Sequence, residues 1–116
     1  MIQLYAEKNR LTVQQREPLT SGARNIYLAR FDFSEDWAGL EKTVVFQYGD
    51  TKTAVLPDQA GECVIPWEVL TGYGRPLMVG VYGTQDKITV LPTIWASLGT
   101  VLEGVSLEEQ PPPTPE

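Results

Sequence analysis

Two alternating apolar patterns flank a short turn between residues 75 and 98. In the first arm every second residue, Leu77, Val79 and Val81, is apolar, which is typical of a strand with one buried face. Directly opposed residues of an antiparallel pair share a face, so one register buries the apolar sets of both arms together. The pattern therefore predicts a hairpin that organises a β-rich core. The apolar set of the second arm is Ile88, Val90, Ile94, Ala96 and Leu98.

The predicted turn of this hairpin is a four-residue loop at residues 83–86. This loop sets Val81 opposite Ile88 and Val79 opposite Val90, which keeps apolar side chains together. Pro92 has no backbone N–H, so we expect the second arm to bulge or to lie at a sheet edge there.

A second hairpin is predicted at residues 42–56, around a three-residue loop at residues 49–51. That loop places Phe46 opposite Ala54 and Val44 opposite Leu56. A two-residue loop would instead pair Phe46 with a threonine, and is the less favoured register.

The rest of the chain adds short strands and two helical turns. Residues 34–40 and the segment that follows Pro66 each suit a single helical turn. Residues 14–24 are mostly polar, and a loop of this length often crosses from one sheet to another. Further strands are expected at residues 2–5, 11–13, 25–33, 62–65 and 100–102.

These elements predict one all-β domain at residues 1–104: an antiparallel, immunoglobulin-like β-sandwich or partly open barrel of about seven to nine short strands. The proline-rich, acidic residues 105–116 read as a linker or tail. With one cysteine the immunoglobulin disulfide cannot form, so Phe46 or Trp95 should fill the centre.

Charge and cysteine usage limit the partners and the compartment. The net charge of −6 opposes binding to nucleic acid or to an anionic membrane surface. Cys63 lies in a strand-like run, which indicates a buried structural thiol. The first residues lack a signal-peptide pattern, and no apolar stretch approaches the ~20 residues of a membrane span. We therefore expect synthesis in a bacterial cytoplasm and no membrane partner.

Residue chemistry argues against catalysis. The chain has no histidine, which removes the Ser–His and Cys–His nucleophile pairs and the usual zinc ligand. A single cysteine cannot build a thiolate metal site, and the glycine-containing segments lack the Lys-Ser/Thr of a phosphate loop. The prediction is a protein that is not an enzyme and needs no cofactor.

Asp32, Glu35 and Asp36 form an acidic corner after a predicted strand. Acids of this kind serve calcium sites and glycosidases, but the spacing matches no EF-hand loop and no rule selects two catalytic carboxylates. A solvated acidic surface is the favoured interpretation, and ion binding at this corner stays an open alternative.

Four aromatic residues are candidates for interaction: Trp37, Trp67, Tyr73 and Trp95. Rings at loop tips beside acids stack on sugars in carbohydrate-binding sandwiches, which makes the first three candidate glycan contacts. Large aromatic side chains bury the most area, and the apolar neighbours of Trp37 and Trp67 favour their plugging the ends of the sandwich. Trp95 falls in the strand phase opposite the core, where it would anchor an interface.

Four segments carry a family resemblance: FDFSEDWAGLEKTVVF, GECVIPWEVL, PLMVGVYGT and LPTIWASLGTVLEG. Over nearly its whole length the chain resembles small proteins encoded among the tail and baseplate genes of phages and prophages of Gram-positive bacteria. Such proteins look like an N-terminal immunoglobulin-like sandwich followed by a Pro-rich linker and a fibrous segment that oligomerises. The run PPPTPE matches the linker. The resemblance implies homo-oligomerisation through a downstream segment that these 116 residues do not include.

The function implied by the resemblance is structural and located in the virion. The sandwich would be a tail, baseplate or fibre attachment module that contacts other virion proteins through strand edges and anchors such as Trp95. The alternative is a carbohydrate-binding sandwich that recognises host cell-wall polysaccharide through Trp37, Trp67 and Tyr73. A bacterial surface module is a third hypothesis, against which the missing signal-peptide pattern counts.

Overall fold

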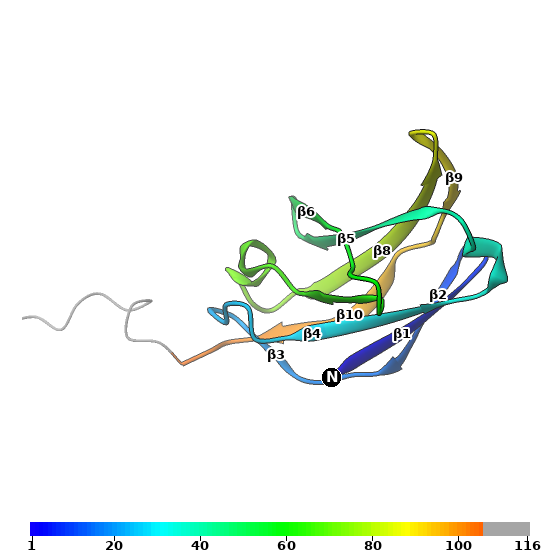
Figure 1. Cartoon of the computed structure of the whole chain (residues 1–116). Coiled ribbons are helices and arrows are strands. Elements are labelled where there is room, and N and C mark those ends of the chain that lie inside the picture. The colour runs from blue at the N-terminus through cyan, green and yellow to red at the C-terminus, as the bar shows by residue number, and fades with distance from the viewer. Residues whose placement is uncertain (106–116) are drawn as a thin grey trace, which may run out of the picture.

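The computed structural model describes residues 1–105 as two β-sheets packed against each other (Figure 1). The predicted all-β sandwich with two short helical turns is confirmed, with ten strands in the described part. The strands are β1 (Ile2–Glu7), β2 (Arg10–Gln15), β3 (Leu19–Thr20), β4 (Leu28–Phe33), β5 (Glu41–Tyr48), β6 (Thr51–Val55), β7 (Glu62–Val64), β8 (Pro76–Gln85), β9 (Ile88–Pro92) and β10 (Ala96–Leu102), and the 3₁₀ turns are η1 (Glu35–Trp37) and η2 (Trp67–Leu70).

The smaller sheet has the strand order β2-β1-β4-β7, and the larger sheet has the order β3-β10-β8-β5-β6, with β9 also paired to β8. Most pairs are antiparallel as predicted, but β1 with β4 and β10 with β3 are parallel. Parallel neighbours need a long connection, and here the chain leaves the smaller sheet after β2, contributes β3 to the larger sheet and returns as β4. The predicted crossing of the polar loop between sheets is therefore confirmed.

The core lies between the two sheets and follows the predicted phase of β8. Leu77, Val79 and Val81 are all buried, as is Phe31 from β4. Phe46 of β5 is fully buried, whereas Trp95 is 43% exposed. Of the two residues predicted to fill the centre, Phe46 therefore belongs to the core and Trp95 does not.

The β8–β9 hairpin forms, but its predicted four-residue loop is wrong. The turn consists of Asp86 and Lys87 alone, at φ values of 53° and 68°, the conformation of a type I′ turn. Gly83, expected in the loop, lies inside β8 on the core face. A Cβ at Gly83 would lie 2.8 Å from Leu40 Cδ1 and 3.1 Å from the Trp37 ring. A glycine is needed at this position because a larger residue would collide with Leu40 and Trp37, and not because a turn requires it.

The shorter turn moves the apolar residues of the second arm away from the core. Ile88 pairs with Gln85, where the prediction paired it with Val81, and its side chain is 68% exposed. Val90 and Ile94 are also exposed, whereas Leu98, further along β10, is buried as predicted. Pro92 ends β9, which pairs only with β8 in the described part of the chain, as expected for a proline at a sheet edge.

The β5–β6 hairpin also forms in the register that the sequence disfavoured. Its loop has two residues, so Phe46 pairs with Thr53 and the predicted partner Ala54 pairs with Val45. Leu56 is consequently 74% exposed. Both phases of β6 contain apolar residues, and a slip of one residue exchanges the faces, so opposition of apolar residues alone does not decide this register.

The two predicted helical turns are confirmed as η1 and η2. Residues 106–116, most of the predicted linker, lie outside the described residues. No helix within residues 1–105 is long and apolar enough to span a membrane.

Candidate functional site

Trp37 belongs to the core. Its side chain is fully buried, its indole Nε1 donates a hydrogen bond to the Lys8 carbonyl at 3.1 Å, and its ring lies 5.3 Å from the Phe33 ring between centroids. The plugging interpretation is therefore confirmed for Trp37, and this residue cannot contact a glycan in the folded protein.

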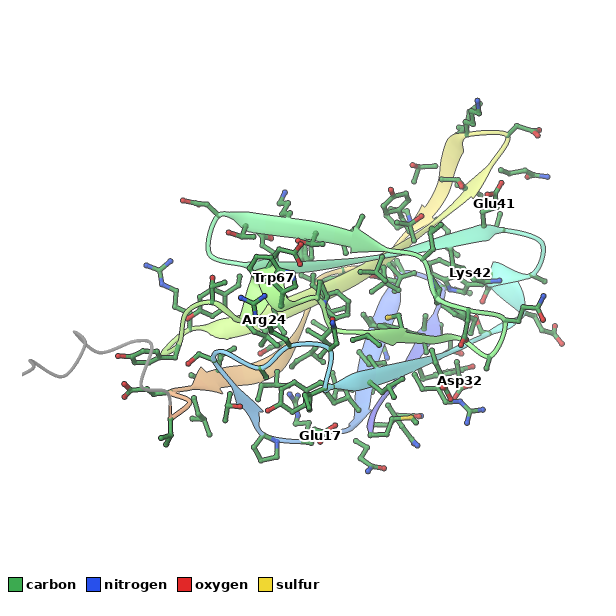
Figure 2. All side chains as sticks on the ribbon, turned by 60° about the vertical axis from the view of Figure 1, so that its left-hand side comes forward. Glu17, Arg24, Asp32, Glu41, Lys42 and Trp67 are labelled. Atoms are coloured by element: carbon green, nitrogen blue, oxygen red, sulfur yellow. The ribbon has the colours of Figure 1, made fainter. Side chains whose placement is uncertain are left out.

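Trp67 is accessible, so the plugging prediction is wrong for it. The side chain is 39% exposed, and the Arg24 guanidinium lies over its ring at 4.6 Å from the centroid (Figure 2). The next residues of η2, Val69 and Leu70, are buried and fill the interior in its place. Tyr73, in the turn before β8, is 52% exposed.

Trp95 lies on the outer face of the larger sheet, in a seat made by Gly80. A Cβ at Gly80 would come within 3.3 Å of the indole Cε3, so the glycine lets the ring approach the backbone of β8. Val81 N donates to Thr93 Oγ1 at 2.9 Å and Thr93 N donates to the Val81 carbonyl at 2.8 Å, which ties down the chain just before the tryptophan. The Trp95 residue itself is still 43% exposed.

The register of the larger sheet places further apolar side chains beside Trp95. Gly80 pairs with Val45, and Val45 pairs with Ala54, so one row runs from the tryptophan seat to the edge strand β6. The Lys52 ammonium lies 6.0 Å from the Trp95 ring centroid. We call this surface the Trp95 face; it consists of Thr43, Val45, Gln47, Lys52, Ala54, Leu56, Met78, Tyr82 and Trp95.

A second exposed apolar region is the β8–β9 hairpin, which projects from the body of the sandwich (Figure 1). Ile88 and Val90 are its exposed aliphatic side chains. A shallow groove of about 580 Å³ runs along it, lined by Lys8, Asn9, Asp36, Val90, Leu91 and Pro92.

The acidic corner shows no arrangement typical of a metal site. Asp36 accepts a hydrogen bond from the Ser34 hydroxyl at 2.8 Å, and Asp32 lies 3.7 Å from Arg30 Nε. Within residues 1–105, no three His, Cys, Asp or Glu side chains come together closely enough to hold an ion.

Cys63 is the buried thiol that the sequence predicted. It pairs with Ala29 across the smaller sheet, and burial together with the negative charge of Asp58 raises the pKa of Cys63 to about 12. The thiol therefore stays protonated at neutral pH and is a poor nucleophile.

Sequence reasoning identified Trp95 but missed the surface around it. Tyr82 and Leu56 were not singled out, because an apolar residue on an outer sheet face has the same alternation as one on an inner face. The available signal was Gly80 in the middle of a strand pattern, since a glycine there often marks a close approach of another group.

Comparisons with protein-family models, with curated proteins and with solved structures found no match for this chain. The grounds for assigning a function are therefore the surface described above and the resemblance of the four sequence segments.

Proposed function

We propose that this chain is a non-enzymatic structural module of a phage tail or baseplate, which makes protein–protein contacts in the virion. The observation that carries the proposal is the Trp95 face, where the tryptophan is 43% exposed among residues 1–105 and the chain just before it is hydrogen-bonded to β8. Tryptophan and tyrosine are the residues most enriched among interface hot spots. The resemblance to tail and baseplate proteins is the reason for placing the module in a virion.

The composition of the Trp95 face supports contact and offers little for catalysis. Its apolar and aromatic members supply the contact area, and Thr43, Gln47 and Lys52 add polar groups, a mixture that is found in protein interfaces. In the described part of the chain, β6 pairs only with β5 and β9 only with β8, so each also presents a strand edge. An extended segment of a partner can add to such an edge. Homo-oligomerisation through a downstream segment stays a prediction.

The carbohydrate alternative in its predicted form is less well supported. It relied on three rings, of which Trp37 is buried and Trp67 is covered on one side by Arg24. Of the three rings, Tyr73 is the one that still supports the carbohydrate alternative, because it is 52% exposed.

Mass spectrometry of purified particles tests the virion assignment. Particles induced from a strain that encodes the chain should contain it together with the tail proteins. Detection of the tail proteins without this chain would refute the assignment.

Adding the recombinant chain back to particles that lack it tests the Trp95 face. Trp95→Ala should weaken association about 30-fold or more, the effect of losing a hot spot of about 2 kcal/mol. Leu56→Asp should also weaken association, and this residue is too exposed for the change to disturb the core. Tyr73→Ala, an exposed aromatic outside the face, is the matched control and should bind normally. Normal binding by both face variants would exclude this surface as the contact.

A further inference from the structure

A hollow of about 400 Å³ opens at the flank of the sandwich, where β4 and the start of β5 meet the loop between β6 and β7. Small-molecule sites have volumes of this order. Asp32 and Lys42, which belong to neighbouring walls of the hollow, lie at the same end of the molecule in Figure 2. The hollow shares no residue with the Trp95 face; its lining is Phe31, Asp32, Phe33, Lys42, Pro57, Asp58, Gln59, Ala60 and Gly61.

The loop that forms one wall is held in shape by its own hydrogen bonds. Asp58 Oδ1 accepts the backbone N–H groups of Ala60 and Glu62, both at 2.9 Å. The Gly61 carbonyl accepts the Phe31 N–H at 2.7 Å, and Gly61 has a φ of 81°. A Cβ at Gly61 would collide with the Phe31 carbonyl, so this position requires glycine. A wall that is already ordered loses little conformational entropy when a ligand binds.

The lining combines donors and acceptors around an aromatic ring. Gln59 offers both an acceptor and donors, and the Lys42 ammonium lies 5.2 Å from the Phe33 ring centroid. The Asp32 carboxylate lies 3.7 Å from Arg30 Nε, on the outward face of β4. Among the described residues, the ion pairs within 4.0 Å are those of the N-terminal amine with Glu17 and of Arg30 with Asp32. The donors of Lys42 are therefore not neutralised by a carboxylate at short range.

These charges favour a neutral ligand. An anion would meet the negative charge of Asp58, and a cation would meet the ammonium of Lys42. A hydroxyl group both donates and accepts, so a hydroxyl-rich molecule can satisfy acidic and basic side chains at once.

We propose that this hollow binds one unit of a neutral saccharide. Lys42 and Gln59 donate hydrogen bonds to its hydroxyl groups, and the side-chain oxygen of Gln59 accepts one from them. This binding site goes beyond the structural role proposed above and does not depend on it. It also differs from the predicted glycan contacts at Trp67 and Tyr73.

Titration of the ¹⁵N-labelled full chain with glucose, galactose and N-acetylglucosamine, followed by NMR, tests the proposal. At least one neutral sugar should give saturable shifts at concentrations up to about 10 mM, centred on residues 31–33, 42 and 57–61. Glucose 6-phosphate should bind more weakly than glucose. No saturable shift with any of the three sugars, stronger binding of the phosphate, or shifts centred on Trp67, Tyr73 or Trp95 would overturn it.

Variants give a second readout. Lys42→Ala and Gln59→Ala should each weaken the binding of the responding sugar, by about tenfold for the charged donor. Lys52→Ala, a matched lysine on the Trp95 face, should leave the affinity unchanged, and the amide spectra report whether each variant is folded. Unchanged affinity in a folded Lys42→Ala chain would contradict the assignment. Because purified chain is used, failure here leaves the virion experiments unaffected.

Discussion

Two tryptophans lie against glycines of the same strand, on opposite faces of it. Trp37 packs on the core face of β8 at Gly83, and Trp95 lies on the outer face at Gly80. Trp37 is fully buried, whereas 43% of Trp95 is exposed. The same local device, a glycine that admits a ring close to the backbone, serves two different environments.

The difference lies in what covers each ring. Leu40 and Phe33 close the inner seat, so the Trp37 ring contributes its full apolar area to folding. Nothing in the described part of the chain closes the outer seat, and 43% of Trp95 stays exposed. The inner seat should therefore control stability, and the outer seat should control association.

The largest expected difference is between alanine variants of the two rings. Trp37→Ala should lower the free energy of unfolding by about 3–5 kcal/mol, through lost burial and the cavity left behind. Trp95→Ala should lower it by less than about 1 kcal/mol, as for most exposed positions. Urea unfolding followed by circular dichroism measures both. Similar losses for the two variants would break the distinction between the seats.

A smaller contrast is expected when a methyl group is added to each glycine. Gly83→Ala should cost about 1–2 kcal/mol, because its Cβ meets Leu40 at 2.8 Å and the Trp37 ring at 3.1 Å in a packed core. Gly80→Ala should leave stability within about 0.5 kcal/mol of the parent, since the exposed Trp95 ring can tilt away and alanine suits a strand better than glycine. The same urea experiment applies. A larger loss at Gly80 than at Gly83 would show that the outer seat is the tighter one.

The smallest expected effect is a pH dependence of the free energy of unfolding that arises from the buried thiol of Cys63. Burial raises the pKa of Cys63 from 9.0 to about 12, so below pH 9 both the folded and the unfolded chain keep the proton. Above pH 9 the unfolded chain loses it first, and the free energy of unfolding should fall by up to about 1.4 kcal/mol for each further pH unit. Urea unfolding at about pH 8 and about pH 10 measures the fall.

Cys63→Ala is the control for this pH effect, because other groups titrate in the same range. The variant should lose less stability between the two pH values than the parent chain. An equal loss in both chains would assign the alkaline destabilisation to groups other than the thiol.

Much of the fold was predictable because it depends on alternation within single strands. The apolar phase of β8, the buried Cys63 and the helical turn that carries Trp37 all follow from neighbouring residues, and all are confirmed. The hairpin registers were not predictable in this way. In both hairpins the sequence permits two turn lengths, and the choice depends on packing from segments distant in the chain, as with Leu40 above Gly83.

The candidate site was predictable only at one residue. Trp95 stood out because it falls in the phase opposite the core, but the row that joins it to Val45 and Ala54 requires the pairing of three strands. Trp67 was mispredicted for the same kind of reason. Val69 and Leu70 are the residues of η2 that are buried, and Trp67 stays at the surface. The flank hollow brings β4 together with a loop about 25 residues further along the chain, which no local pattern indicates.

By itself the sequence determined that this chain forms strands, which residues of β8 face inward and that no histidine chemistry is available. These properties depend on residue type and on a period of two, which are local. Tertiary structure alone decided which apolar residues stay exposed, which tryptophans are accessible and where a polar hollow opens. Those outcomes depend on which side chains, from segments distant in the sequence, occupy the limited volume between the sheets. That is determined only when the two sheets pack together.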